Sequence, residues 1–145
     1  MSDQIFYHSF LNRDRLIYIA DPDPTTCETL SVLFRLEGLQ TAFSLEAGDF
    51  AAGLERRRPD IVVLNFQLGE ESGLSLLRRI KYMRVGTPVI MLADTPPLDA
   101  AVAAMKLGAA DVVCKPVDTE HLLSGVGIER ELGADLQRRV VESRQ

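Results

Sequence analysis

Apolar residues along this chain occur in short unbroken runs that alternate with longer amphipathic stretches. Four runs, residues 16–20, 61–64, 88–93 and 112–114, are continuous rather than alternating. Continuous apolar runs of this length are typical of strands that are buried on both faces. A weaker run covers residues 39–44. The pattern therefore predicts five strands.

The stretches between the runs have helical spacing. Asp21-Pro22-Asp23-Pro24 ends the first run, because proline cannot continue a strand and an acidic residue often begins a helix. Residues 26–38 then place apolar side chains three or four positions apart, and Gly38 is a suitable C-cap. Comparable patterns predict helices over residues 47–58, 72–83, 97–107 and from 119 onward.

Strands that alternate with helices predict an α/β fold. Parallel strands need crossover connections, and helices on both faces bury such strands completely. We therefore expect an open five-stranded parallel sheet flanked by helices on both faces, which is a flavodoxin-like arrangement. Ligands in such sheets bind at the carboxyl ends of the strands. Asp21, Asn65, Ala93 and Lys115 occupy those ends here.

The length of 145 residues, 46% of them hydrophobic, fits one domain. We divide the chain into an N-terminal extension (1–15), a core domain (16–124) and a charged C-terminal helix or linker (125–145) that leads toward an absent output domain. The extension carries Ile5, Phe6, Phe10 and Leu11. Those apolar residues predict packing on the domain or on a second subunit, with a loose tail as the alternative.

Composition narrows the class of protein. The 21 acidic against 16 basic residues argue against general binding to a phosphate backbone. Cys27 and Cys114 lack C-x-x-C spacing and are expected to be small core residues. No apolar run approaches the ~20 residues that span a bilayer, and the first ten residues do not resemble a signal peptide. We therefore expect a cytoplasmic protein.

Four segments carry a more specific signature. They are LIYIADPDP, PDIVVLNFQLGEESGLSLLRRIK, TPVIML and AAMKLGAADVVCKP. Over roughly residues 16–123 the chain resembles the receiver domain of two-component response regulators. This resemblance implies phosphoryl transfer from a histidine kinase to an aspartate after the third strand. It also implies Mg²⁺ held by carboxylates, a lysine after the fifth strand, a Ser or Thr after the fourth strand and an aromatic switch residue on the fifth strand.

The residues at the acceptor and metal positions depart from that pattern. The phosphoacceptor position is Asn65, whose amide is uncharged and a poor nucleophile. Pro22 replaces one of the two acidic residues after the first strand, so Asp21 is the only matching carboxylate. Asp23 lies one residue beyond the pattern. Because Mg²⁺ prefers several carboxylate and water oxygens, we expect no cofactor, and Mg²⁺ binding that is weak at best.

The two switch positions depart from the pattern as well. Ala93 stands where the family has a hydroxyl, and Val112 stands where it has an aromatic ring, whereas Lys115 is retained. We predict that the Asn65 amide donates to Asp21 and accepts from Lys115, which would form a neutral cluster without metal. The alternative is that Lys115 points into solvent.

The sequence thus predicts a pseudo-receiver that is not an enzyme and that regulates transcription through protein contacts. We expect a homodimer through the fourth helix, fifth strand and fifth helix, a surface that includes Lys106, Asp111 and Glu120. DNA would be contacted only by an output domain outside this chain, and a histidine kinase remains a candidate partner. Two alternatives stay open: a phosphorylatable receiver with an engineered Asn65, and a stand-alone adaptor. An unrelated flavin or nucleotide binder would need a glycine-rich loop, which residues 21–26 lack.

Overall fold

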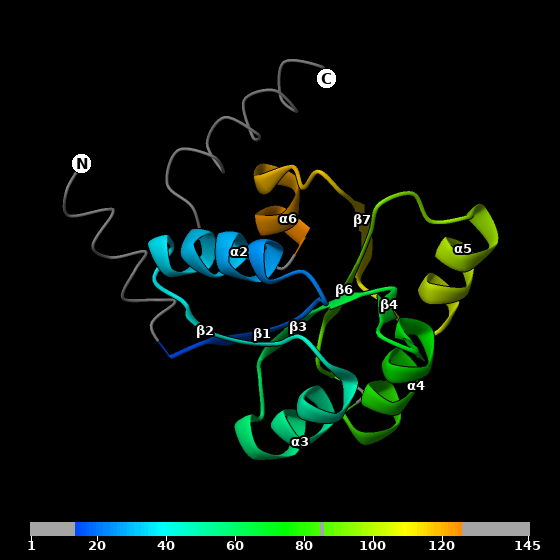
Figure 1. The fold of residues 1–145 in the computed structure, drawn as a ribbon, viewed down its shortest axis with the longest axis horizontal. Helices are drawn as coiled ribbons and strands as arrows, with labels where there is room; N and C mark the ends of the chain where they lie inside the picture. Colours follow the sequence, from blue (N-terminus) through cyan, green and yellow to red (C-terminus); the bar gives the residue numbers. More distant parts are fainter. Residues whose placement is uncertain (1–13, 85, 126–145) are drawn as a thin grey trace.

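A computed structural model describes residues 14–84 and 86–125 of the chain and places their main strands in one parallel sheet (Figure 1). The strand order is β2-β1-β3-β6-β7. Their bounds are β1 (Leu16–Ala20), β2 (Gln40–Ser44), β3 (Ile61–Asn65), β6 (Val89–Ala93) and β7 (Asp111–Cys114). The predicted open, five-stranded parallel sheet is confirmed.

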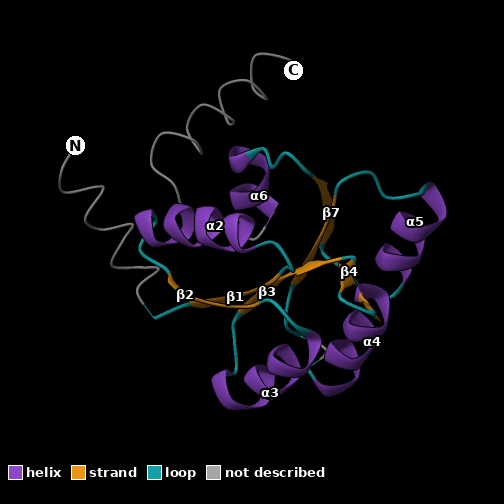
Figure 2. Ribbon diagram, viewed as in Figure 1, coloured by secondary structure: helices purple, strands orange, loops and turns teal. Residues whose placement is uncertain are grey.

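Helices cover both faces of this sheet (Figure 2). Helices α2 and α6 lie on one face, and α3, α4 and α5 lie on the other. Their bounds are α2 (Pro24–Leu36), α3 (Ala47–Arg57), α4 (Gly73–Met83), α5 (Leu98–Lys106) and α6 (Thr119–Gly125). Within the described residues, no helix is long and apolar enough to cross a bilayer.

The unbroken apolar strands are explained by two cores. Successive side chains of a strand point to opposite faces of the sheet. Accordingly, Ile17 and Ile19 of β1 pack with α2 and α6, whereas Tyr18 and Ala20 pack with the helices of the other face. All four residues are buried. A strand with a core on each side needs apolar residues at every position, as the sequence pattern indicated.

Helix α2 begins earlier than its sequence pattern predicted. Asp23 is its N-cap, and Pro24 occupies the first helical position, where the missing backbone N–H costs nothing. The helix ends before Gly38, whose positive φ of 90° is accessible to glycine without strain. The predicted start at residue 26 was therefore two residues late.

A short hairpin after β3 was not predicted. Strands β4 (Gln67–Leu68) and β5 (Glu71–Ser72) pair in antiparallel fashion as a separate two-stranded sheet. Gly69 between them has a φ of 66°, which glycine adopts readily. Two residues are too few for a recognisable alternation of apolar and polar positions. The hairpin turns the chain back toward α4 directly beyond the end of β3.

Tyr18 fixes the distance between β1 and α3. Its buried hydroxyl lies 2.5 Å from the Ser44 hydroxyl, and its ring centroid lies 5.1 Å from that of Phe50. The Arg57 guanidinium lies 5.9 Å from the ring centroid. Gly53 of α3 faces the tyrosine, and a Cβ at this position would overlap the phenol oxygen. Glycine at position 53 is therefore required by the close approach of Tyr18.

Two predicted segments extend outside the described residues. The N-terminal extension (1–15) is described only from Asp14, and the C-terminal helix or linker (125–145) only at Gly125. The predictions for these segments stay predictions. The sequence boundary of the core at Leu16 coincides with the first residue of β1.

Candidate functional site at the carboxyl ends of the strands

The four predicted strand-end residues lie along one edge of the sheet. Asp21 follows β1 and Lys115 follows β7, while Asn65 and Ala93 are the last residues of β3 and β6. The parallel register pairs Asn65 with Leu92 and Ala93 with Cys114. Because all these strands run in the same direction, their ends form a single edge. The expectation that the residues gather there is confirmed.

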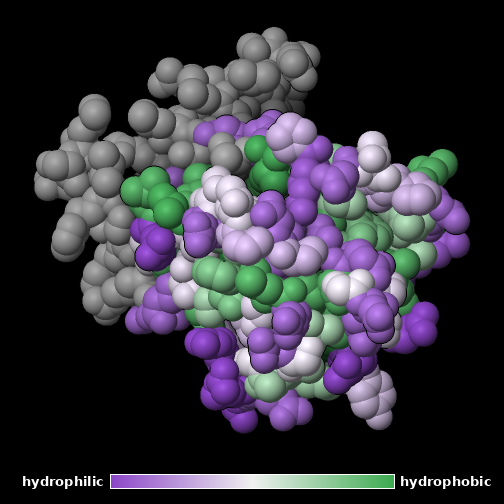
Figure 3. Space-filling view, viewed as in Figure 1, coloured by the Kyte–Doolittle hydropathy of each residue, from purple (hydrophilic) through white to green (hydrophobic). Residues whose placement is uncertain are grey.

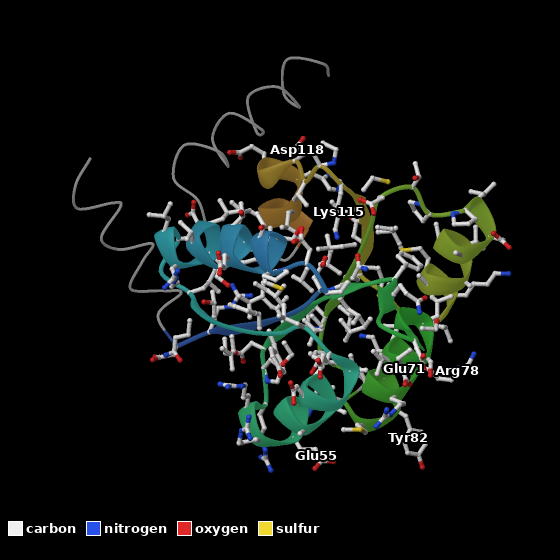
Figure 4. All side chains as sticks on the ribbon, in the orientation of Figure 1. Glu55, Glu71, Arg78, Tyr82, Lys115 and Asp118 are labelled. Carbon is white, nitrogen blue, oxygen red and sulfur yellow. The ribbon has the colours of Figure 1, made fainter. Side chains whose placement is uncertain are left out.

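Asp21 and Lys115 form an ion pair at this edge. The Lys115 Nζ lies 2.6 Å from Asp21 Oδ2, and the Lys115 side chain is only 17% exposed while that of Asp21 is fully buried. Among the described residues, no hydrogen-bond donor is aligned on Oδ2, so the ammonium is what balances its charge. Figure 4 shows Lys115 at the end of β7, near the start of α6. The alternative that Lys115 points into solvent is wrong.

The loop after β1 holds the second oxygen of Asp21. The backbone N–H of Asp23 donates to Asp21 Oδ1 over 2.9 Å. The Asp23 carboxylate itself accepts from the Thr25 N–H (3.1 Å) and from the Thr26 hydroxyl (2.8 Å). The hydrogen bond from Thr26 is the main reason that the pKa of Asp23 is lowered from its ordinary value of 3.8. Asp23 therefore caps α2, and the neighbouring Pro22 is exposed.

Asn65 makes a different contact from the one predicted. Its Nδ2 donates to the carbonyl oxygen of Gln67 over 2.7 Å. Across the described chain, no hydrogen bond joins Asn65 to Asp21 or Lys115, so the predicted cluster of three residues is wrong in this respect. The β4–β5 hairpin explains the difference, because it presents a carbonyl only two residues away. Lys115 meanwhile already neutralises Asp21.

Gly73 positions the backbone around Asn65, and sequence reasoning missed it. The Gly73 N–H donates to the Phe66 carbonyl over 2.7 Å. A Cβ at Gly73 would overlap the carbonyl oxygen of Asn65 and the backbone of Phe66. The signal in the sequence was a glycine at the start of a helix, where Ser72 is the N-cap and its hydroxyl accepts from the Leu74 N–H. A glycine at that position indicates close approach of another backbone.

The strand-end site offers fewer oxygen donors than Mg²⁺ requires. Mg²⁺ favours octahedral coordination by carboxylate, substrate and water oxygens. Asp21 offers one carboxylate, and one of its oxygens is already within 2.6 Å of an ammonium. The Asp23 carboxylate is used in the helix cap. No group of three His, Cys, Asp or Glu side chains in the described ranges could share a metal ion. These residues do not fit a magnesium site of the kind that the family resemblance implied.

The two predicted switch positions lie on adjacent strands. Ala93 is buried at the end of β6, and its methyl group offers no hydrogen bond. Val112 of β7 is half-buried and packs against the core that faces α5. Beside it is an open hollow of about 510 Å³, whose lining includes Val102, Met105, Lys106 and Asp111. Of the two switch positions, Val112 therefore borders the exposed surface of α5.

Residues 17–126 match the protein family described as the response regulator receiver domain. The chain belongs to this family. Its receiver domain is 29% identical over 107 residues to the probable transcriptional regulatory protein TcrX of Mycobacterium tuberculosis, covering 74% of this chain and 46% of the relative. It is 32% identical over 115 residues to the response regulator protein TodT of Pseudomonas putida, covering 79% of this chain and 51% of the relative.

Solved receiver structures share the fold. A CheY-like receiver domain protein from Methanospirillum hungatei has a TM-score of 0.74 at 24% identity, covering 78% of this chain and 90% of that one. The BeF3-activated DrrB receiver domain has a TM-score of 0.71 at 27% identity, covering 78% of this chain and 94% of that one. The described residues thus have the fold of a receiver domain. The chain spans about half the length, or less, of the curated relatives that it matches.

Proposed function

We propose that this receiver domain is a regulatory module that works without phosphorylation and without catalysis. The observation that carries the proposal is the state of Asn65, whose amide ends β3 and is bonded to the Gln67 carbonyl. Forming an acyl phosphate requires a carboxylate oxygen to attack phosphorus, and an amide does not supply this nucleophile. Residue 65, at the phosphoacceptor position, would therefore not be phosphorylated.

The neighbouring residues support the same proposal. Lys115, the residue expected to neutralise a phosphoryl group, is held 2.6 Å from Asp21. Ala93 has no hydroxyl to donate to a phosphoryl oxygen, and Pro22 has no carboxylate for a metal. We accordingly propose that the module needs no cofactor and that its affinity for Mg²⁺ is weak at best.

Transmission of the signal would then depend on protein contacts, and we propose a homodimer through α5, β7 and α6. Leu98 of α5 is 81% exposed, and Val102 and Met105 are exposed beside the hollow next to Val112. Lys106 and Asp111 line the same hollow. In a two-fold symmetric pair, opposite charges on one patch can meet across the axis. The surface therefore combines apolar area with self-complementary charge.

The dimer is tested by measuring molar mass in solution by light scattering. Replacing Met105 with Asp places a charge on the lining of the hollow and should yield monomers at concentrations where the unmodified protein is a dimer. Tyr82→Asp is the matched control, because Tyr82 is exposed on α4 and its side chain points away from α5 and β7 in Figure 4. A Met105→Asp protein that remains dimeric would exclude this surface.

We propose that the output is transcriptional and lies outside this chain. Relatives named as transcriptional regulators are about twice as long as the matched segment or longer. The excess of acidic residues, with a net charge of −5, makes direct contact of this domain with DNA unfavourable. We propose that DNA is bound only by the output domain and that the protein acts in the cytoplasm. A histidine kinase would be a partner only if Asn65 were not the native residue.

Restoring the acceptor tests the proposal on phosphorylation. The unmodified protein, Asn65→Asp and Asn65→Asp/Pro22→Asp/Ala93→Thr are each incubated with acetyl phosphate and Mg²⁺, and intact mass is measured. We expect no phosphoryl adduct on the unmodified protein, a weak one on the single variant and a strong one on the triple variant. Gln67→Asp is the matched control, because it adds a carboxylate at an exposed position two residues away.

Two outcomes would contradict the proposal. A Mg²⁺-dependent adduct on the unmodified protein would show that phosphorylation does not need Asp at position 65. Full phosphorylation of Asn65→Asp alone would favour a phosphorylatable receiver in which Asn65 is a substitution. Either result would also show that Pro22 and Ala93 do not impair the chemistry.

A further inference from the structure

An apolar groove runs along α2 and borders the strand-end site at Lys115. It has a volume of about 410 Å³, and its walls are α2 and the loop after β7. Its apolar lining includes Val32, Leu33, Leu36, Pro116 and Val117. Leu36 is 75% exposed and Val32 is 49% exposed. Figure 3 shows hydrophobic surface over the later end of α2. We call this surface the α2 groove.

The charge of the groove restricts what can occupy it. Lys115 is the only charged side chain on the lining within the described residues, and its ammonium is already paired with Asp21. The remaining polar lining consists of three threonines of α2. A charged occupant would lose hydration without gaining a partner, which is costly. The groove therefore favours an uncharged, apolar segment.

The chain that precedes β1 enters the fold at one end of this groove. The Arg15 carbonyl accepts from the Gln40 N–H over 2.9 Å, and Gln40 lies four residues after Leu36. The Leu39 N–H in turn donates to the Phe34 carbonyl at the end of α2. Figure 1 shows the start of β1 and the later end of α2 on the same side of the molecule. Arg15 is thus hydrogen-bonded to the strand that follows α2, four residues after the exposed Leu36.

The sequence that precedes Arg15 has the chemistry that the groove favours. Residues 5–11 read IFYHSFL, in which five of seven side chains are apolar or aromatic and none is Asp, Glu, Lys or Arg. In extended form seven residues span up to about 23 Å. The helical rise from Leu36 back to Thr25 is about 16 Å. The segment is therefore long enough to follow the whole groove.

We propose that residues 5–11 occupy the α2 groove of the same molecule. This position would cover Leu36 and Val32 and bring the segment against the loop that carries Lys115. The other segment outside the described residues fits less well, since eight of the twenty residues 126–145 are charged. The proposal concerns a surface distinct from the acceptor position and from the α5–β7–α6 face. This proposal does not depend on the proposed function, and either can be disproved without affecting the other.

The first experiment is methyl NMR on the full chain. Ring currents of Phe6 and Phe10 should shift the methyl resonances of the residues that they contact. In Phe6→Ser/Phe10→Ser the methyls of Val32, Leu36 and Val117 are expected to move, and those of Leu98 and Val102 on α5 to stay. Phe43→Ser, at an exposed position on β2, is the matched aromatic control and should leave the groove methyls in place.

The second experiment changes the groove instead of the segment. Leu36→Asp should accelerate chymotrypsin cleavage within residues 5–11 several-fold, because a released apolar segment is accessible to protease. Leu98→Asp is the matched control, since Leu98 is as exposed as Leu36 but lies on α5, and it should leave the cleavage rate unchanged.

Three results would overturn the proposal. The first is that the methyl resonances of the groove do not shift in Phe6→Ser/Phe10→Ser. Another is groove methyls that shift on dilution, which would assign the groove to a second copy of the chain. The third is groove methyls that respond to Leu132→Ser/Leu136→Ser and not to the phenylalanine changes, which would assign it to the C-terminal segment.

Discussion

Lys115 Nζ lies 2.6 Å from Asp21 Oδ2, and this contact joins the ends of two strands that are not neighbours in the sheet. Strands β3 and β6 lie between β1, which precedes Asp21, and β7, which precedes Lys115. The ion pair therefore links the outer strand β7 to the centre of the fold across the strand-end edge. Asp21 is fully buried, and the Lys115 ammonium is the cation that pairs with its carboxylate.

Replacing Lys115 with Met should destabilise the domain by about 3 kcal/mol, because the buried carboxylate of Asp21 loses its counter-charge. Urea unfolding followed by circular dichroism measures this change. Lys106→Met is the control, as Lys106 is exposed on α5, and should change stability by less than about 0.5 kcal/mol. Adding Asp21→Asn to Lys115→Met should recover part of the loss. An equal loss in the double variant would mean that the charge of Asp21 is not the cause.

Gly53→Ala should destabilise the domain by about 2 kcal/mol, because its Cβ would overlap the buried hydroxyl of Tyr18. Gly48→Ala is the control in the same helix, since nothing lies within 4 Å of a Cβ there. It should be neutral or slightly stabilising. Tyr18→Phe removes the hydroxyl and its hydrogen bond to Ser44, so Gly53→Ala should cost less in that background. Additive losses in denaturant unfolding would rule out the steric coupling.

Gly73→Ala should cost about 3 kcal/mol, because its Cβ would meet the backbone of Asn65 and Phe66, which cannot rotate away as a side chain does. The amide resonances of Asn65, Phe66 and Gln67 should shift along with the loss of stability. The same Gly48→Ala variant serves as the control. A stable Gly73→Ala protein with unchanged amide shifts would show that the end of β3 does not need this close approach.

Alkaline pH should weaken the fold through Cys27. Burial, followed by the nearby Asp21 carboxylate, raises the pKa of the Cys27 thiol from its ordinary value of 9.0 to about 11. Between these values the unfolded chain loses the thiol proton and the folded chain keeps it, so stability is full below pH 9 and falls toward pH 11. The slope from this group approaches about 1.4 kcal/mol per pH unit.

Comparison with Cys27→Ala isolates that contribution, because other groups that titrate in this range are common to both proteins. The free energy of unfolding of the unmodified protein should fall more steeply from pH 9 to 11 than that of Cys27→Ala. Cys114 is exposed at the end of the edge strand β7, so the prediction that both cysteines are core residues is confirmed for Cys27 and wrong for Cys114. Cys114→Ala should therefore keep the steep slope. Parallel pH profiles for the unmodified and Cys27→Ala proteins would show that the thiol stays accessible to solvent.

The sequence by itself determined the order of the strands along the chain and the residues at their ends. The run 16–20 coincides with β1, and 112–114 lies within β7. Strand β1 was recognisable because both of its faces are buried, which requires an apolar residue at each position. Strand β7 lies at the edge of the sheet and is less buried, and its apolar run is correspondingly shorter. Asp21, Asn65, Ala93 and Lys115 could then be assigned to one edge, because parallel strands end on the same side of a sheet.

Only the tertiary structure decided which of those residues touch. Lys115 reaches the buried Asp21, whereas Asn65 turns to Gln67 in a hairpin too short to leave a pattern in the sequence. The need for glycine at positions 53 and 73 likewise depends on Tyr18 and on the end of β3, which are distant along the chain. The spacing of apolar residues along the sequence indicates which side chains are buried, but it does not indicate which residues cover them. Contacts between residues that are distant in the sequence depend on how the helices and strands pack together. This packing determines that Lys115 pairs with Asp21 and that Asn65 binds Gln67.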